Sequence, residues 1–390
     1  MRDEADVVLY LVNAAEQPEA AGYVAPEMDL LGWIGKPVVV LLNQLGPPRD
    51  AQFEDAERAR WQRHLAGRAQ VVTVLPLDAF ARCWVQEITL LRIVEQALGG
   101  ERRALMARLR AAWLAQRETT FETAMQSLAG NLARLAVASQ QVPASQGFRE
   151  RVRSFGAKLG LGGSVQDTGP VAQAQAALAE RLGAELRANT LELIALHGLT
   201  GDAHGEILTR IATHYELRLR MDEGKAAMWG GMLTGAIAGL KADIVSGGLT
   251  LGGGLLAGGL IGALGAAGLA RCVNLVRGTD RSWLAWNAEA LDQMVEAALM
   301  RYLAVAHFGR GRGDWVEGEA PPHWAAHAHR ALAPYRDALA VLWAERGVGD
   351  ADPNAAERTA QALRPVIEQA TRALLNGLYP GSLVSGTAAA

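Results

Sequence analysis

Amide and carboxylate side chains stand shortly after two apolar, β-branched runs in the first hundred residues. Asn43 and Gln44 directly follow the run Val38–Leu42, and Asp78 lies just beyond the run Val71–Leu75. Such groups can hydrogen-bond a ligand, or they can hold the turn that ends a strand. For Asn43 both interpretations, ligand contact and turn residue, stay open.

The groups that bind the phosphates of a nucleotide have no match in the chain. No stretch fits Gly-x-x-x-x-Gly-Lys-Ser/Thr, the loop that supplies backbone N–H groups, a lysine and a Mg²⁺-binding hydroxyl. The Asp-x-x-Gly match at 29–32 lies inside a helical pattern, and we expect the glycine-rich stretch 160–164 to be a loop. We therefore expect no catalytic residue in this chain and no hydrolysis of a nucleotide by it.

Two histidines have a spacing that can bind a metal. His323 and His327 share one face of a predicted helix, but no acidic residue stands between them as in the zinc hydrolases. We expect them to be surface or packing residues and the chain to hold no metal.

Composition excludes some classes of protein. The 390 residues carry 38 Lys and Arg against 41 Asp and Glu, a net charge of -3, so nucleic acid is not an expected partner. Cys83 and Cys272 follow no metal or redox spacing, which favours a reducing compartment such as the cytoplasm. The apolar run near the N-terminus is too short for an export signal.

The first 99 residues predict an α/β domain. The runs Val7–Val12, Pro37–Leu42 and Gln70–Leu75 are uniformly apolar, as expected of parallel strands covered on both faces. Helical patterns over Val24–Ile34, Glu54–Leu65 and Val85–Leu98 follow these runs, so we expect a parallel sheet of about three strands.

The rest of the chain predicts helices. We expect helices over 101–138, 171–196, 206–223, 283–308, 324–346 and 355–378, with a flexible loop near 139–170. The predicted domains are 1–99, a helical region 100–225, a glycine-rich hairpin 226–278, C-terminal helices 279–380 and a disordered tail 381–390.

The order of these elements resembles bacterial Era-like P-loop GTPases that carry a helical, glycine-rich C-terminal domain. Asn43-Gln44-Leu45-Gly46 stands where the family has its base-recognition loop, usually Asn-Lys-x-Asp, and Asp78 falls in the last base-contacting loop. The run Ala5–Ala14 resembles the strand after the Asp-x-x-Gly switch. The resemblance implies weak base contacts from Asn43, Gln44, Gly46 and Asp78, and GTP with Mg²⁺ for a complete family member.

Two departures from the family pattern change what is expected. Gly46 replaces the carboxylate that accepts hydrogen bonds from guanine, which leaves the base specificity open. The P-loop and both switch segments are missing, so the chain resembles an N-terminally truncated G domain without a bound cofactor of its own. The strand Val7–Val12 would then lie at an exposed edge, a hazard for aggregation.

The glycine-rich block has a pattern typical of closely packed helices. Ile244–Ala270 holds ten glycines in 27 uncharged residues. Glycines recur every fourth residue, which keeps small residues on one helix face. They are Gly231, Gly235 and Gly239 in one segment, and Gly254, Gly258 and Gly262 in the next. A membrane-inserted hairpin, a buried soluble hairpin and a self-assembling glycine zipper all fit this pattern.

These observations favour a GTPase-family protein whose helical domain associates with the bacterial inner membrane from the cytoplasm. Its nucleotide chemistry would be lost in the chain as it stands, and self-association through the glycine-rich helices is an option. The alternative is a non-enzymatic membrane-associated scaffold or adaptor, with the α/β segment as a docking module. The protein partner is not predicted.

Overall fold

The computed structural model describes residues 2–45, 51–78, 83–142, 170–199, 273–277, 282–307, 322–347 and 352–381. These residues form two compact units. The first unit comprises 1–122, 303–328 and 371–390, and the second comprises 123–302 and 329–370. The predicted helix 206–223, the glycines at 231–262 and the tail 382–390 lie outside the described residues.

The first unit begins with the predicted parallel sheet. Its strands β1 (Val8–Asn13), β2 (Val38–Asn43) and β3 (Val71–Pro76) lie in the order β1-β2-β3. Both pairs are parallel, and Asn13 is the register partner of Asn43 at the carboxyl end of the sheet. All three strands were predicted to within one residue at each end, because β-branched runs specify them strongly.

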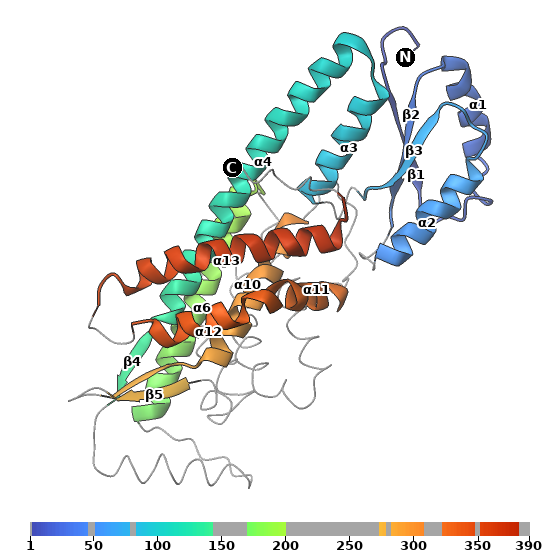
Figure 1. The fold of residues 1–390 in the computed structure, drawn as a ribbon. Coiled ribbons are helices and arrows are strands. Elements are labelled where there is room, and N and C mark those ends of the chain that lie inside the picture. The colour runs from blue at the N-terminus through green and yellow to red at the C-terminus, as the bar shows by residue number, and fades with distance from the viewer. Residues whose placement is uncertain are drawn as a thin grey trace, which may run out of the picture. The chain divides into compact units, whose positions relative to one another are not determined.

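Helices cover the two faces of this sheet unequally (Figure 1). α1 (Val24–Ile34) and α2 (Ala51–His64) pack on one face, where Met28 and Trp61 join Val38, Val40 and Leu42 in a buried core. α3 (Trp84–Ala97) packs on the opposite face. There Leu90 and Ile93 contact the smaller cluster of Val39, Leu41 and Leu77.

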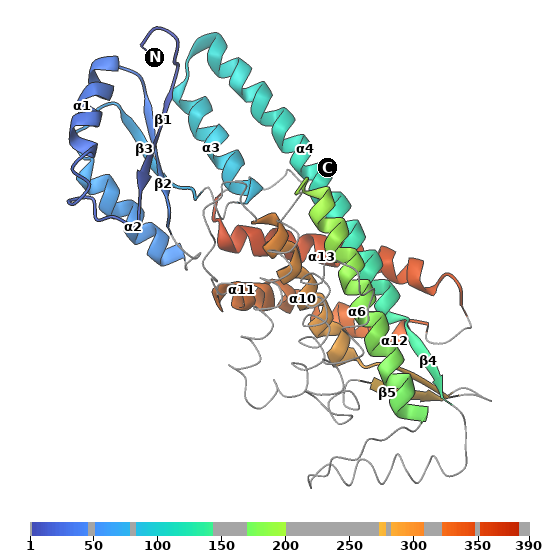
Figure 2. The same ribbon diagram turned by 180° about the vertical axis from the view of Figure 1, so that it is seen from behind.

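β1 is an edge strand of the described sheet, and the described residues leave one of its faces partly exposed. Val12 is buried, but Leu9 and Leu11, whose side chains alternate with it, are 44% and 56% exposed. The same alternation in β2 leaves Val39 and Leu41 buried, so the described residues cover this face more fully over β2 than over β1. The view from behind shows α3 beside the sheet, on the face opposite to α1 and α2 (Figure 2).

α4 (Gly100–Ala136) follows α3 and contributes to both units. Within the first unit it is joined to α3 by two ion pairs, Arg110–Glu95 at 2.6 Å and Arg117–Glu87 at 3.0 Å. The first unit also holds the buried His307, whose Nδ1 donates to the carbonyl of Leu303 and whose Nε2 accepts from the hydroxyl of Tyr379 at 2.7 Å.

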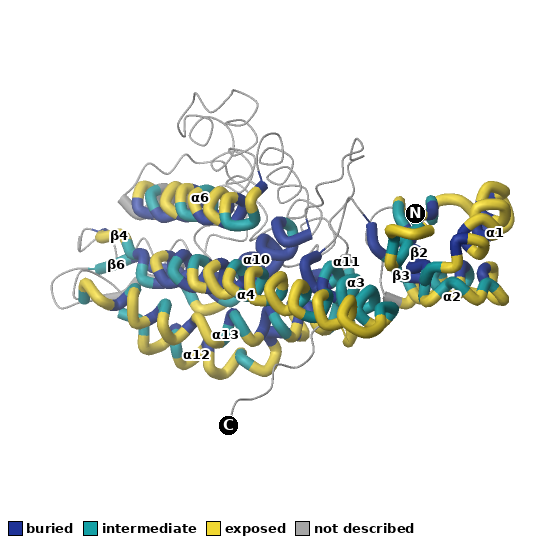
Figure 3. The backbone as a smooth tube through the Cα atoms, turned by 90° about the horizontal axis from the view of Figure 1, so that it is seen from above, coloured by how far each residue is buried: buried dark blue, intermediate teal, exposed yellow. Residues whose placement is uncertain are grey.

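The second unit is mostly helical. Its elements are the C-terminal part of α4, α6 (Pro170–Leu196), most of α10 (Ala288–Ala306), η2 (Ala333–Tyr335), α12 (Arg336–Glu345) and most of α13 (Ala355–Leu378). α11 (Pro322–Leu332) is divided between the units. α10 is the most deeply buried of these helices, as its dark blue trace shows (Figure 3).

A small antiparallel sheet in the second unit corrects two predictions. β4 (Ser139–Val142) lies where a loop was expected. β6 (Ser282–Trp286) occupies the start of the predicted helix 283–308, and β5 (Val273–Arg277) lies within the predicted hairpin 226–278. β6 pairs with both neighbours in the order β4-β6-β5, and α10 begins only at Ala288.

A third correction concerns the predicted helix 324–346. It is two helices, α11 and α12, joined by the 3₁₀ turn η2, because Pro334 cannot donate an N–H to the helical ladder. The expected helices 101–138, 171–196 and 355–378 correspond to α4, α6 and α13. Among the described residues no helix is both long and apolar enough to cross a membrane.

Candidate functional site

The carboxyl end of the parallel sheet carries most of the sequence-predicted site residues. In open α/β sheets this end, with the loops that follow the strands, is where ligands bind. β1 ends at Asn13 and β2 at Asn43, and the backbone N–H of Ala14 donates to the carbonyl of Asn43 at 2.8 Å. The two strand ends are thereby fixed to each other.

The side chain of Asn13 shapes the turn that follows β1. Its Oδ1 accepts from the backbone N–H of Ala15 at 3.0 Å, and its Nδ2 donates to the carboxylate of Glu16 at 3.1 Å. This is an Asx-turn, in which an amide replaces a backbone partner. Asn13 was not among the predicted site residues, although an asparagine directly after an apolar strand is a signal that the sequence offers.

Gln44 has a left-handed backbone. Its φ of 57° is the one positive φ of a non-glycine residue in the described part of the chain. Residues outside glycine, asparagine and aspartate rarely adopt this conformation, and those that do cluster at turns and binding sites. β2 ends at Asn43, immediately before this residue.

Asp78 connects the ends of β2 and β3. It is 6% exposed, and its Oδ2 accepts a 2.8 Å hydrogen bond from the backbone N–H of Leu45. The backbone N–H of Leu77 also donates to the carbonyl of Leu42 at 3.1 Å. The structure therefore brings the loop after Asn43 and the residue Asp78 together, while Gly46 lies outside the described residues.

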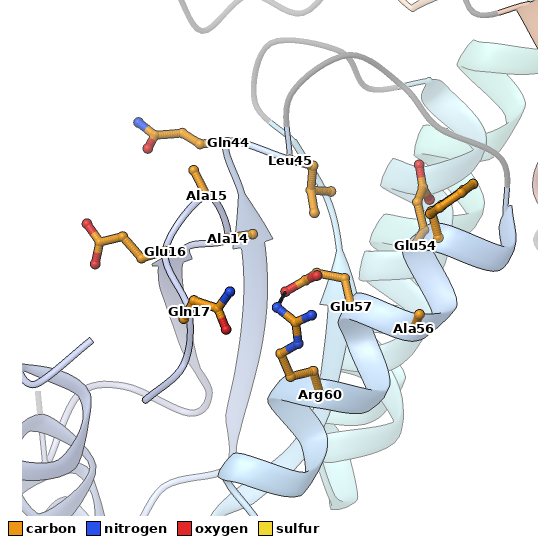
Figure 4. Close-up of a pocket in the computed structure, with 11 residues that line it drawn as sticks. Ala14, Ala15, Glu16, Gln17, Gln44, Leu45, Glu54, Ala56, Glu57 and Arg60 are labelled. Atoms are coloured by element: carbon orange, nitrogen blue, oxygen red, sulfur yellow. Dashed lines mark ion pairs between the residues drawn. The ribbon is translucent and has the colours of Figure 1, made fainter. Parts of the chain in front are cut away.

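A cavity of about 510 Å³ opens between the turn after β1 and the helix α2 (Figure 4). The β1 turn and the end of β2 form one wall, and α2 forms the other. The lining residues are Ala14, Ala15, Glu16, Gln17, Gln44, Leu45, Phe53, Glu54, Ala56, Glu57 and Arg60. Three of these are acids and one is a base, so the cavity is acidic.

The α2 wall holds a donor and an acceptor side by side. Arg60 Nη1 lies 3.5 Å from Glu57 Oε1, the ion pair drawn in Figure 4. That oxygen is buried and accepts no hydrogen bond from the described residues. A buried acceptor without a donor is uncommon in folded proteins.

Glu54, near the start of α2, has a perturbed acidity. Burial raises the pKa of Glu54 to about 7, and the negative charges of Asp55 and Asp78 add to the rise. Near neutral pH this side chain changes between a hydrogen-bond donor and an acceptor. Neither Glu54 nor Glu57 was predicted, since isolated glutamates on a polar helix give no sequence signal.

The paired histidines form no metal centre with other described residues. The rings of His323 and His327 meet edge to face with centroids 6.1 Å apart. No group of three or more His, Cys, Asp or Glu side chains that suits a metal ion occurs in the described ranges. His327 packs against Gly377 so closely that a Cβ there would lie 2.8 Å from Nδ1.

Comparisons with known proteins identify the C-terminal part only. Residues 216–368 match a family model described as a domain of unknown function (DUF3482). This range includes β5, β6, α10, α11, α12 and the first part of α13. Neither the search of curated proteins nor that of solved structures gives a match. The chain is therefore similar to this family over 216–368, after an α/β region that the comparison leaves unassigned.

Proposed function

We propose that the α/β region is the base-binding side of a P-loop GTPase-type domain, and that further strands complete its sheet beside β1. The observation that carries the proposal is the apolar face of β1, which the described residues leave partly exposed. Leu9 and Leu11 are about half exposed, whereas Val39 and Leu41 on the same face of β2 are buried. Parallel sheets are covered on both faces in nearly all known folds.

The energetics support a missing cover. Burying a leucine side chain fully stabilises a fold by about 1.5 to 3 kcal/mol, so two half-exposed leucines leave a sizeable gain unused. A helix packed beside α3 would cover both. In the family that the sequence resembles, the first strand of the G domain pairs with the strand that corresponds to β1.

The free edge of β1 supports the same proposal. The backbone N–H of Val8 donates to Pro37 and that of Ala14 donates to Asn43, so the even-numbered residues face β2. The N–H and C=O groups of Leu9 and Leu11 then point to the opposite side, because these groups alternate along a strand. They are available to another strand.

The proposal assigns base binding and phosphate binding to different segments of a GTPase-type domain. Asn43, Gln44 and Asp78 belong to the base side, where they hold the two loops in position. Phosphate binding and Mg²⁺ chemistry need a Gly-x-x-x-x-Gly-Lys-Ser/Thr loop, which this chain lacks. On this proposal the 390-residue chain alone does not hydrolyse GTP, and GTP with Mg²⁺ is bound only where such a loop is present.

The helical region belongs, in this proposal, at the cytoplasmic side of the inner membrane. The support is the sequence of residues 226–278, with its uncharged, glycine-rich runs and flanking basic residues such as Lys225 and Arg271. Carbonate extraction of membranes from the source cells tests this part. Retention in the membrane pellet is expected, and complete release by carbonate contradicts an inserted hairpin.

Nucleotide content tests the GTPase proposal. The endogenous protein, purified from its own cells in Mg²⁺ buffer, is heated and the released nucleotides are separated by chromatography. We expect bound GDP or GTP and Mg²⁺-dependent turnover from the endogenous protein, and neither from the recombinant 390-residue chain. Absence of both from the endogenous protein overturns the proposal and favours the membrane scaffold.

A further inference from the structure

We propose that Glu57 is the carboxylate that reads the guanine edge, in the cavity between the β1 turn and α2. The inference rests on the proposed function for the choice of a nucleotide as ligand. It adds a residue that the family pattern does not supply, since position 46 is a glycine here.

The first step is the unmet acceptor. Glu57 Oε1 is buried, receives no hydrogen bond from the described residues and lies at the cavity wall. Its charged neighbour is Arg60, 3.5 Å away in an ion pair that does not meet hydrogen-bond geometry, so a ligand N–H would supply the hydrogen bond that this oxygen lacks. The side chain belongs to α2, a rigid element, so its position does not depend on loop order.

The second step is the charge of the cavity. Glu16, Glu54 and Glu57 line the cavity together with a single base, Arg60, and of these acids only Glu57 is drawn in an ion pair with Arg60 (Figure 4). Such a balance disfavours phosphate, which carries negative charge, and favours the part of a nucleotide that donates hydrogen bonds. The phosphates of a bound nucleotide would therefore lie outside this cavity.

The third step is the pattern of donors. The guanine edge presents two N–H donors next to a carbonyl oxygen, whereas adenine presents one amino donor next to a ring nitrogen. A carboxylate can accept both guanine donors, and Arg60, 3.5 Å from Glu57 Oε1, can donate to the carbonyl. Small side chains at Ala14, Ala15 and Ala56 leave room for a flat ring.

The test uses nucleosides, because these probe the base without the phosphate site. Saturation-transfer NMR on the 390-residue chain compares guanosine, adenosine and N1-methylguanosine, which lacks one of the two donors. A base-sized ligand alone is expected to bind in the millimolar range. We expect guanosine to bind about tenfold more tightly than the other two.

Variants locate the site. Glu57→Gln keeps the shape of the side chain and is expected to remove the preference for guanosine. Ala56 lines the cavity from an exposed position of α2. Ala56→Leu is expected to fill part of the cavity and to lower the binding of all three nucleosides. The controls do not line the cavity: Glu19→Gln, at an exposed position, for the charge change, and Ala59→Leu, on the same helix, for the added bulk. Thermal melting checks that each variant is folded.

Two results overturn the inference: equal binding of guanosine and N1-methylguanosine, or an unchanged guanosine preference in Glu57→Gln. Failure of the proposed function is a separate result. If the endogenous protein carries GTP but Glu57→Gln leaves its base preference unchanged, only the role of Glu57 is wrong. If guanosine binds through Glu57 but the endogenous protein holds no nucleotide, only the GTPase proposal is wrong.

Discussion

The backbone N–H of Leu45 donates a 2.8 Å hydrogen bond to the carboxylate of Asp78, 33 residues further along the chain. This contact joins the loop after β2 to the end of β3. Asp78 is nearly buried, so its main effect is to hold the two loops together. Gln44, in its left-handed conformation, directs the backbone toward this bond.

Loss of the Asp78 carboxylate should loosen both loops. Asp78→Ala leaves the Leu45 N–H without this acceptor, and we expect a loss of about 1 to 2 kcal/mol in the free energy of unfolding. Asp78→Asn keeps an oxygen at the same place and should lose less. Urea denaturation measures both, and equal losses in the two variants would contradict this role.

Glu54 makes stability depend on pH in a defined direction. Its folded pKa of about 7 is above the ordinary value of 4.5, so the folded state binds the proton more tightly than the unfolded state. The resulting stabilisation is complete below about pH 4.5 and is lost as the pH rises through 7. The charges responsible, besides burial, are those of Asp55 and Asp78.

Glu54→Gln removes this dependence. We expect the variant to melt at a higher temperature than the wild-type chain at pH 8, where wild-type Glu54 is charged. At pH 5 the two should melt within a few degrees of each other, because wild-type Glu54 is then neutral. A difference of the same size and sign at both pH values would contradict the assignment. Glu19→Gln serves as a control, because Glu19 is exposed and is not among the charges that raise the pKa of Glu54.

Arg346 holds three chain segments of the second unit through their carbonyl groups. Its guanidinium donates to Ala136 at the end of α4, to Trp286 at the end of β6 and to Trp343 of its own helix. Burial lowers the pKa of Arg346 from its usual value. The last carbonyls of a helix, such as that of Ala136, have no partner within the helix.

Arg346→Met should therefore be strongly destabilising. We expect a loss of about 3 kcal/mol in the free energy of unfolding, because several carbonyls lose a charged donor together. Arg346→Lys restores one of the three bonds at most, and it should recover only part of the loss. A loss below about 1 kcal/mol for Arg346→Met in urea denaturation would contradict this role.

The exposed face of β1 gives a prediction whose outcome differs between the 390-residue chain and the endogenous protein. In the 390-residue chain Leu11 is more than half exposed, so Leu11→Lys should change the free energy of unfolding by less than about 0.5 kcal/mol. It should also reduce aggregation, since charges block pairing at an edge. Val12→Lys, on the buried face, is the control and should prevent folding.

The same Leu11→Lys change should destabilise an endogenous protein in which a helix covers β1. Thermal melting of the endogenous protein with and without the substitution tests this. Equal melting temperatures there would mean that β1 stays uncovered, against the proposal.

The parallel sheet could be predicted because each strand is a dense run of β-branched residues, bounded by helical patterns. The antiparallel sheet could not. Ser139–Val142 is short and polar, and its stability comes from pairing with Trp283 and its neighbours, far away in sequence. Trp283–Trp286 reads as the first turn of the helix that follows, since both segments are apolar. Pro334 was the one visible sign that the helix 324–346 is broken.

The candidate site could be predicted only where strands end. Asn43, Gln44 and Asp78 stand out because they interrupt apolar runs. Glu54, Glu57 and Arg60 gave no such signal, since a polar helix face is ordinarily just a solvated surface. Their proximity to the β1 turn depends on how α2 packs on the sheet, through Trp61 in the core.

The central claim is that β1 is an inner strand of a larger nucleotide-binding sheet. The intact mass and N-terminal peptide of the protein from its own cells test it most directly. The account predicts a mass well above 41.5 kDa and an upstream segment with a Gly-x-x-x-x-Gly-Lys-Ser/Thr loop. A native protein of 41.5 kDa that begins at Met1 would contradict it.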